Sequence, residues 1–177
     1  SLALGAEATF VARSIDMDRD LTAGILEEAK NHKGSAFIEI YQNCNVFNDK
    51  AFEQLTNKET KVANRINLVH GEKTVFGSDN HKAVVIRDGI AEIVDTKDVD
   101  ESEIYVHNIY EENPSIAFSL SRLSHGPYGP TPLGIFRKVQ RDSFTEEVHG
   151  QIENAKEQKG EGDVDKLIRS LGTWDVG

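Results

Sequence analysis

Two apolar stretches, residues 9–15 and 35–41, flank a segment with the periodicity of an amphipathic helix. Apolar side chains recur every fourth residue in that segment, at Leu21, Ile25 and Ala29. Asp16 and Asp18 precede this pattern, where carboxylates favour a helix N-terminus, and Gly34 follows it as the expected C′ glycine. A strand, a helix and a second strand at this spacing predict a right-handed βαβ unit in a parallel sheet.

After residue 41 the pattern changes to shorter elements. Strands are expected at residues 66–70, 83–86, 90–94, 104–107 and 134–139, and the turn at 87–89 joins the second and third of them as a hairpin. A capping-box pattern at Ser143 and Glu146 opens a later helix, and Asp163 caps a final short one. We therefore predict an α/β fold in two parts. The end of a parallel-sheet domain occupies residues 1–56, and a mixed α+β C-terminal extension occupies residues 57–177.

Composition excludes several classes of function. The chain has 177 residues, of which 38% are hydrophobic, enough for one sizeable core. Its formal net charge of −10 argues against a nucleic-acid partner, which would need a basic face. No apolar run approaches the roughly 20 residues that cross a bilayer, so we expect no membrane partner. A single cysteine excludes an internal disulfide framework and predicts a reducing, cytoplasmic compartment.

The sequence begins in mid-pattern. It starts at Ser1 without an initiator methionine, and Met17 is its only methionine. No basic stretch precedes an apolar one, so no signal peptide is expected. These features predict the downstream part of a longer polypeptide, and any site that needs upstream residues would then be incomplete here.

The only cysteine, Cys44, follows directly after the second predicted strand, which we expect to be buried. α/β proteins place chemistry just past the ends of such strands, so a functional thiolate is one interpretation. A buried cysteine that fills apolar space is the other. A cysteine nucleophile would need a base, and His70 and His107 are candidates without a local motif. The six histidines lack metal-site spacing, and residues 160–163 lack the Gly-Lys-Ser/Thr ending of a phosphate loop.

Two segments resemble the β subunits of 2-oxoacid:ferredoxin oxidoreductases, most closely those of the 2-oxoglutarate type. They are residues 4–13 (LGAEATFVAR) and residues 37–48 (FIEIYQNCNVFN). Residues 133–137 and the Thr173-Trp174 pair fit the same family more weakly, and the resemblance runs over essentially the whole chain. It implies that residues 1–56 are the C-terminal part of a thiamine-diphosphate-binding domain.

The resemblance also implies a reaction. In this family a 2-oxoacid undergoes CoA-dependent oxidative decarboxylation, and electrons pass through iron–sulfur to ferredoxin. The intact enzyme is expected to hold thiamine diphosphate, magnesium and a [4Fe–4S] cluster. Its expected partners are an α subunit and possible further subunits of the same oxidoreductase, with ferredoxin, the 2-oxoacid and CoA. Cys44, followed by the Phe47-Asn48 pair, matches the family's late cluster ligand and is the one metal-binding residue we predict.

The chain departs from the family in what it lacks. The family's Gly-Asp-Gly motif for thiamine diphosphate and magnesium is absent, and Gly162-Asp163 is no substitute because no Asn pair follows it. Three of the four cluster cysteines are absent as well. We therefore predict no complete cofactor site and no catalytic residue in this chain, and we expect it to be inactive when isolated.

A non-catalytic α/β subunit-assembly module is the alternative, in which the Pro/Gly-rich loop at 125–132 and Trp174 bind a partner subunit. A ferredoxin docking face would require local basic residues, because the chain itself is acidic. The densest basic group after a strand is Arg137, Lys138 and Arg141. This group is either a docking patch or a solvated strand end.

Overall fold

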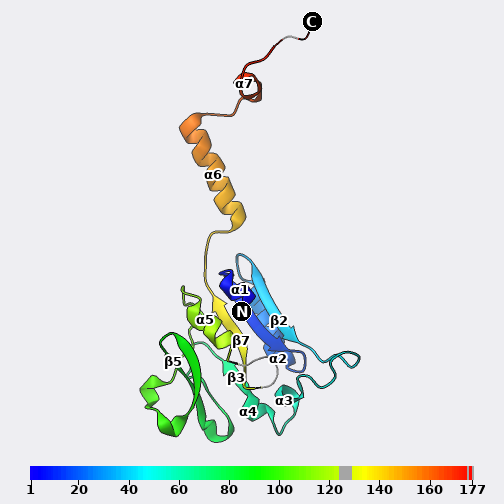
Figure 1. The fold of residues 1–177 in the computed structure, drawn as a ribbon, viewed down its shortest axis with the longest axis vertical. Helices are drawn as coiled ribbons and strands as arrows, with labels where there is room; N and C mark the ends of the chain where they lie inside the picture. Colours follow the sequence, from blue (N-terminus) through cyan, green and yellow to red (C-terminus); the bar gives the residue numbers. More distant parts are fainter. Residues whose placement is uncertain (124–128, 175, 177) are drawn as a thin grey trace. The chain divides into compact units, whose positions relative to one another are not determined.

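The computed structural model describes residues 1–123, 129–174 and 176. Contacts between residues divide the chain into two compact units. The first, Ser1–Arg141, holds both sheets, and the second, Asp142–Gly177, holds two helices (Figure 1).

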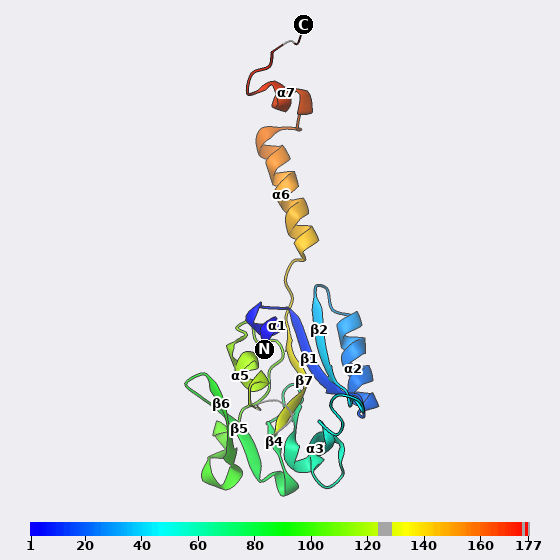
Figure 2. The same cartoon turned by 45° about the vertical axis from the view of Figure 1, so that its right-hand side comes forward.

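A four-stranded mixed sheet forms the centre of the first unit, in the order β2-β1-β7-β3. Its strands are β1 (Phe10–Ile15), β2 (Ala36–Tyr41), β3 (Arg65–Leu68) and β7 (Thr131–Lys138). β1 is parallel to β2, and β3 is parallel to β7, but β7 is antiparallel to β1. The helix α2 (Arg19–Lys30) connects β1 to β2 and packs on one face of the sheet (Figure 2). The α/β class and the predicted βαβ connection are therefore confirmed, in a sheet that is not wholly parallel.

Helix α2 begins where the sequence predicts, but it ends before Gly34, the glycine expected at its C-terminus. The Asp18 carboxylate caps it by accepting a 3.2 Å hydrogen bond from the Leu21 N–H. The helix ends at the cap residue Asn31, so Gly34 is not its C′ residue. Gly34 instead has a φ of +121° and turns the chain into β2, a conformation that a side chain would disfavour.

Strand β7 connects the two predicted parts of the chain. It lies in the predicted extension, yet it pairs with both β1 and β3. Thr131 and Pro132 were expected in a loop but already belong to β7, and residues 124–128 of that expected loop lie outside the described residues. The central sheet therefore takes strands from both sides of residue 56. The division at that residue and the assignment to a thiamine-diphosphate-binding domain remain predictions.

A second, antiparallel sheet has the order β4-β5-β6. Its strands are β4 (Val75–Phe76), β5 (Lys82–Arg87) and β6 (Ile90–Asp95). The predicted hairpin is confirmed: Asp88 and Gly89 join β5 to β6, both with positive φ, as a type I′ turn requires. The strand expected at residues 104–107 is reduced to two isolated bridges, at Ile104 and Val106.

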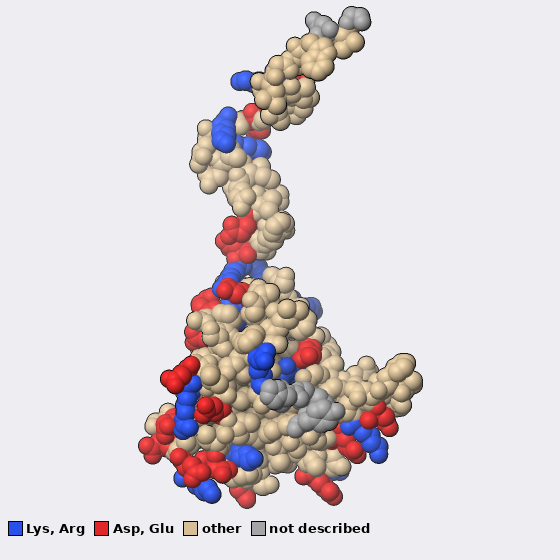
Figure 3. Space-filling view, viewed as in Figure 1, with Lys and Arg blue, Asp and Glu red and all other residues tan. Residues whose placement is uncertain are grey.

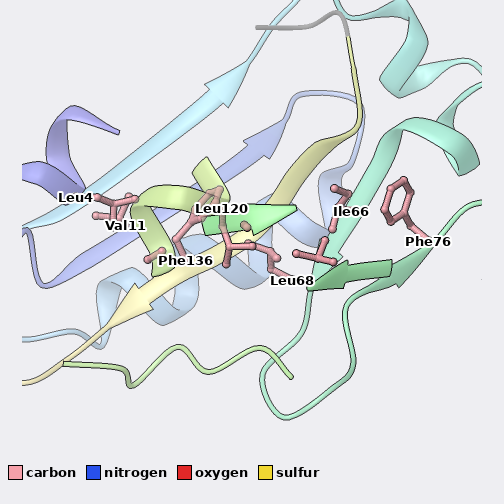
Figure 4. Packing of buried hydrophobic residues seen from close by; sticks show 10 residues of the cluster. Leu4, Val11, Ile66, Leu68, Phe76, Leu120 and Phe136 are labelled. Carbon is pink, nitrogen blue, oxygen red and sulfur yellow. The ribbon is translucent and has the colours of Figure 1, made fainter. Parts of the chain in front are cut away.

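The main hydrophobic core lies between the central sheet, the second sheet and the short helices α1 (Leu2–Gly5) and α5 (Ser115–Ser121). Figure 4 labels seven of its side chains: Leu4, Val11, Ile66, Leu68, Phe76, Leu120 and Phe136. A smaller cluster of Phe10, Ala12 and Ile25 lies between α2 and the opposite face of the sheet. Successive side chains of β1 therefore enter different clusters, as the alternation along a strand requires. The remaining helices are α3 (Glu53–Thr56) and α4 (Lys61–Asn64), with 3-10 turns at Ser78–Asn80, Thr96–Asp98 and Glu101–Glu103.

The second unit consists of α6 (Phe144–Lys159) and α7 (Val164–Arg169). The predicted capping box is present, because Ser143 Oγ accepts from the Glu146 N–H and the Glu146 carboxylate accepts from the Ser143 N–H. Asp163 caps α7 as predicted. Large apolar side chains of this unit are exposed, at Phe144, Val164, Leu167, Ile168, Leu171 and Trp174. Within the described ranges, no helix combines the length and the apolar character that a bilayer span needs.

Candidate functional site

Cys44 lies just past the C-terminal end of β2, where the parallel pair β1 and β2 ends. Loops at this edge of a sheet carry the functional groups of many α/β proteins. The expectation that the preceding strand is buried is wrong. β2 is an edge strand of the described sheet, and its side chains Phe37 and Ile40 are 50% and 43% exposed. The thiol therefore lies at an open corner of the sheet.

One residue, Asn43, holds the loop around Cys44 in place through its side chain and its backbone N–H. Its Nδ2 donates to Asn45 Oδ1 at 2.6 Å and to Asp49 Oδ1 at 3.0 Å. Its Oδ1 accepts from the Lys50 N–H at 2.8 Å. Its own backbone N–H donates to the Asp16 carboxylate at 3.3 Å, which links the loop to the end of β1. These four bonds fix both ends of the segment that carries the thiol.

The environment of Cys44 favours a thiolate. Backbone N–H groups of Phe47, Val46 and Asn48 lower the pKa of the thiol below its ordinary value. The Asn48 N–H also donates to the Cys44 carbonyl oxygen at 2.9 Å, which closes the turn. The side chain is partly exposed, so the interpretation of Cys44 as a buried apolar filler is wrong. The thiolate is the form of cysteine that attacks electrophiles and binds metals.

The two histidines considered as bases for a cysteine nucleophile are engaged elsewhere. His107 is buried, and its Nε2 lies 2.8 Å from the Ile135 carbonyl oxygen. Burial lowers the pKa of this imidazole. The His70 ring packs edge-on against Tyr110 at 4.8 Å between ring centres. Over the described residues neither histidine contacts Cys44, so the structure gives no support to a cysteine hydrolase.

A cavity of about 220 Å³ lies beside the Cys44 loop. It shares Asp16, Asn43 and Lys50 with the hydrogen bonds that hold the loop, and its other lining residues are Met17, Phe52, Glu53 and Thr56. A larger hollow of about 510 Å³ lies between α1, α5 and the β5–β6 turn, and no residue of the Cys44 loop lines it. We take the smaller cavity as part of the candidate site because it opens where the parallel strands end.

Sequence reasoning missed an ion pair between β1 and β2. Arg13 and Glu39 are opposite each other in the parallel register, and Arg13 Nε lies 2.6 Å from Glu39 Oε2. The Arg13 guanidinium also lies 5.3 Å from the ring centre of Tyr41 and 5.2 Å from that of Phe136. The side chain of this arginine is almost completely buried. The signal in the sequence was one basic and one acidic residue at matching positions of two otherwise apolar strands.

The basic group predicted as a possible ferredoxin docking patch, Arg137, Lys138 and Arg141, makes hydrogen bonds and ion pairs within the chain. Arg137 is 1% exposed and donates to the carbonyl oxygens of Glu7, Ala8 and Glu112. Lys138 is hydrogen-bonded to Glu28. Arg141 Nη1 lies 2.7 Å from the Glu7 carboxylate. The group is thus neither a free basic patch nor a merely solvated strand end.

The surface in Figure 3 agrees with this arrangement. Basic side chains on the face shown lie beside acidic ones at several places. A charged side chain attracts a docking protein less strongly when it already has a neighbour of opposite sign. A docking role for the three basic residues therefore has no geometric support.

Comparison with known proteins gives one informative match. No protein-family model matches the chain, and no solved structure matches it. The chain is similar over nearly its whole length to a subunit of a 2-oxoacid oxidoreductase. That relative is the 2-oxoglutarate oxidoreductase subunit KorB of Mycobacterium tuberculosis, with 39% identity over 178 residues. The match covers 99% of this chain and 48% of KorB, so the chain spans about half the length of this relative.

The resemblance read from residues 4–13 and 37–48 is therefore confirmed at the level of the 2-oxoglutarate oxidoreductase subunit. The match has no bearing on the metal-binding role of Cys44, which stays a prediction. The identities of the cofactors and of the partners stay predictions as well.

Proposed function

We propose that this chain is part of the β subunit of a 2-oxoacid:ferredoxin oxidoreductase whose substrate is 2-oxoglutarate. The observation that carries the proposal is the 39% identity to a 2-oxoglutarate oxidoreductase subunit over 99% of the chain. The intact enzyme decarboxylates the 2-oxoacid, transfers the acyl group to CoA and passes two electrons singly to ferredoxin. Because the chain spans 48% of its relative, this activity belongs to the intact enzyme, and we expect the isolated chain to be inactive.

Within that enzyme we assign Cys44 as one thiolate ligand of a [4Fe–4S] cluster. The lowered pKa of the thiol and the backbone N–H groups around it suit an iron-bound sulfur. Hydrogen bonds to a ligating sulfur also adjust the reduction potential of a cluster. Asn43 positions this ligand by holding both ends of its loop. The other three thiolates have to come from outside this chain, since Cys44 is its only cysteine.

The other expected cofactors have no assigned residues here. In the part of the chain that the structure describes, no group of three or more His, Cys, Asp or Glu side chains is placed to hold a metal ion alone. When bound in the intact enzyme, thiamine diphosphate supplies the carbanion chemistry of the decarboxylation. The contribution of this chain is the sheet edge that carries Cys44 and the cavity beside it.

The test of the cluster assignment is substitution of Cys44 in the intact oxidoreductase. Cys44→Ala should lower the iron content by about four atoms per β subunit and remove the matching visible absorption, because a [4Fe–4S] site needs its four thiolates. Val46→Ala is the matched control, since it alters an exposed neighbour and keeps the backbone N–H. An unchanged ratio of iron to protein in the Cys44→Ala enzyme would show that another group fills this role.

A non-catalytic assembly module remains the second candidate, because one observation favours it. The apolar side chains of the second unit, including Trp174, are exposed and available to another subunit. Purification of the natural assembly separates the two candidates. A module of this kind would copurify with partner subunits but without iron that depends on Cys44.

A further inference from the structure

We infer that β2 is an inner strand of a larger sheet, and that its open edge pairs with a parallel strand from the part of the oxidoreductase subunit that this chain does not span. The inference rests on the proposed function, because that function supplies the occupant. KorB has about as much sequence outside the match as within it, since the match covers 48% of its length.

The sequence of β2 is that of an inner strand. Ala36–Tyr41 reads AFIEIY, a nearly continuous run of apolar residues. Parallel strands covered on both faces have such runs, whereas edge strands of natural sheets are usually short, charged or interrupted by proline. Yet no residue of β2 is fully buried, while every residue of its neighbour β1 is. The mismatch between apolar sequence and exposure indicates a missing neighbour.

The backbone of β2 presents one free row of hydrogen-bonding groups. The Tyr41 carbonyl oxygen accepts a 2.9 Å bond from the Asp16 N–H, so the backbone groups of Tyr41 face β1. Backbone groups of successive strand residues point to opposite edges. The N–H and C=O groups of Ala36, Ile38 and Ile40 therefore face the open edge. This edge has no strand partner among the described residues.

Both faces of β2 are open beside this edge. Phe37 is opposite Val11 and lies on the face of the main core. Ile40 lies on the other face, which it shares with Ile38 and α2. An added strand alone would pair the backbone, but side chains on both of its faces are needed to cover Phe37 and Ile40. A further βαβ connection supplies a parallel strand together with such a covering layer.

A second copy of this chain is a weaker occupant. A two-fold axis would pair β2 with its own copy in antiparallel orientation, whereas the β1–α2–β2 connection belongs to parallel architecture. Pairing between copies would also depend on protein concentration. The concentration dependence of protection at this edge therefore distinguishes a second copy from the rest of the subunit.

Hydrogen exchange of single backbone amides tests the inference. In the chain alone, at low concentration, the amides of Ala36, Ile38 and Ile40 should exchange fast, while those of Phe37 and Glu39 are protected by β1. The second sample is a chimera in which this chain replaces the matching 48% of KorB. In the folded chimera the three open-edge amides should exchange at least about 10-fold more slowly, because inner strands open less often than edges.

Three results would overturn the inference. The open-edge amides could stay fast in a chimera that still protects the Phe37 and Glu39 amides. They could already be slow in the dilute chain, which would mean that the edge is not free. They could become slow only as the concentration of the isolated chain rises, which would identify a second copy as the occupant.

A pair of substitutions checks the same edge without relying on exchange rates. Ile40→Pro removes an N–H that faces the open edge, and proline is tolerated at such a position of an edge strand. Ile40→Ala is the matched control that keeps the N–H. We expect similar melting temperatures for the two variants in the isolated chain, but a clearly lower one for the proline variant in the chimera. Equal melting in the chimera, or selective unfolding of the isolated proline variant, would contradict the free edge.

None of these readouts uses iron, thiamine diphosphate or turnover. If Cys44→Ala leaves the iron content unchanged while the open-edge amides become protected, the cluster assignment fails and the sheet extension stands. If the iron is lost but the edge stays open in the chimera, the reverse holds.

Discussion

The two strands of the βαβ unit have the same length and similar apolar sequences, but their burial differs completely. All six residues of β1 are buried, and none of the six residues of β2 is. β1 has a strand on each side, β2 and β7, whereas among the described residues β2 is paired with β1 alone. Burial in this molecule is thus decided by place in the sheet and not by composition. Substitutions around β1 should lower the free energy of unfolding, and those around β2 should weaken pairing with the rest of the subunit.

The polar groups differ in the same way. On the β1–β7 side, Arg137 is buried and donates to three backbone carbonyl oxygens. At the end of β2, Asn43 makes its bonds within an exposed loop. Buried polar groups are expensive to leave without partners, whereas exposed ones can bond to water instead. The first set therefore stabilises the fold, and the second mainly positions the Cys44 thiol.

The largest expected effect compares two phenylalanines. Phe136→Ala should destabilise the isolated chain by about 3–5 kcal/mol, because it opens a cavity in the main core. Phe37→Ala removes the same atoms from a half-exposed position on β2 and should cost less than about 1 kcal/mol. Urea titrations of both variants give the two values. Similar losses would mean that β2 is as well packed as β1, and the comparison would fail.

The next effect concerns the buried arginine. Arg137→Met keeps most of the apolar volume but leaves the carbonyl oxygens of Glu7, Ala8 and Glu112 without their donor. We expect a loss of about 2–3 kcal/mol in the free energy of unfolding, since each buried group without a partner is costly. Lys138→Met, at the neighbouring position, removes only a surface pair with Glu28 and should cost at most about 1 kcal/mol. Equal effects of the two substitutions would contradict a structural role for Arg137.

The sequence predicted the parts of this fold that depend on local chemistry. The cap at Asp18, the capping box at Ser143 and the turn at Asp88-Gly89 are set by neighbours within a few residues. The strand and helix periods of residues 9–41 are likewise local, so the βαβ connection could be predicted.

Features that depend on distant residues could not be predicted in this way. Nothing in the local pattern shows that β7 inserts beside β1 in antiparallel orientation, because that pairing joins residues more than a hundred positions apart. The same holds for Arg137, whose partners at Glu7 and Ala8 lie at the other end of the unit. Cys44 could be singled out from its place after a strand, but the role of Asn43 needed the fold of the loop. The apolar sequence of β2 predicted burial, but β2 lies at the edge of the described sheet, and a local pattern does not show which strands lie beside it.

A smaller effect involves pH and lies on the β1–β7 side. Burial lowers the pKa of His107, whose Nε2 pairs with the Ile135 carbonyl oxygen of β7. The unfolded chain therefore binds a proton more readily than the folded one. The neutral His107 imidazole therefore adds to the free energy of unfolding at a pH above the unfolded pKa of about 6.5. This contribution is lost as the pH falls below that value, by at most about 1.4 kcal/mol per pH unit.

His107→Gln keeps a hydrogen-bond donor but cannot titrate. Urea titrations between pH 7.5 and 5.5 should therefore show a flatter dependence for this variant than for the natural chain. His149→Gln, which makes the same exchange at an exposed position of α6, is the matched control. An unchanged slope in the His107 variant would mean that other groups carry the pH dependence.

The smallest effect on stability should come from Asn43, at the end of β2. Asn43→Ala removes three side-chain hydrogen bonds from an exposed loop, and we expect a loss below about 1 kcal/mol in the free energy of unfolding. The change should appear instead in the thiol. Without the bonds to Asp49 and Lys50, the N–H groups of Val46 and Phe47 no longer stay aimed at the sulfur, so the pKa of Cys44 should rise toward its ordinary value. The rate of alkylation by iodoacetamide as a function of pH measures this shift. Gln42→Ala, at the exposed position next to Asn43, is the control. If the Asn43→Ala profile overlays that of the natural chain, the loop keeps its shape without the Asn43 side chain, and this side chain does not position the thiol.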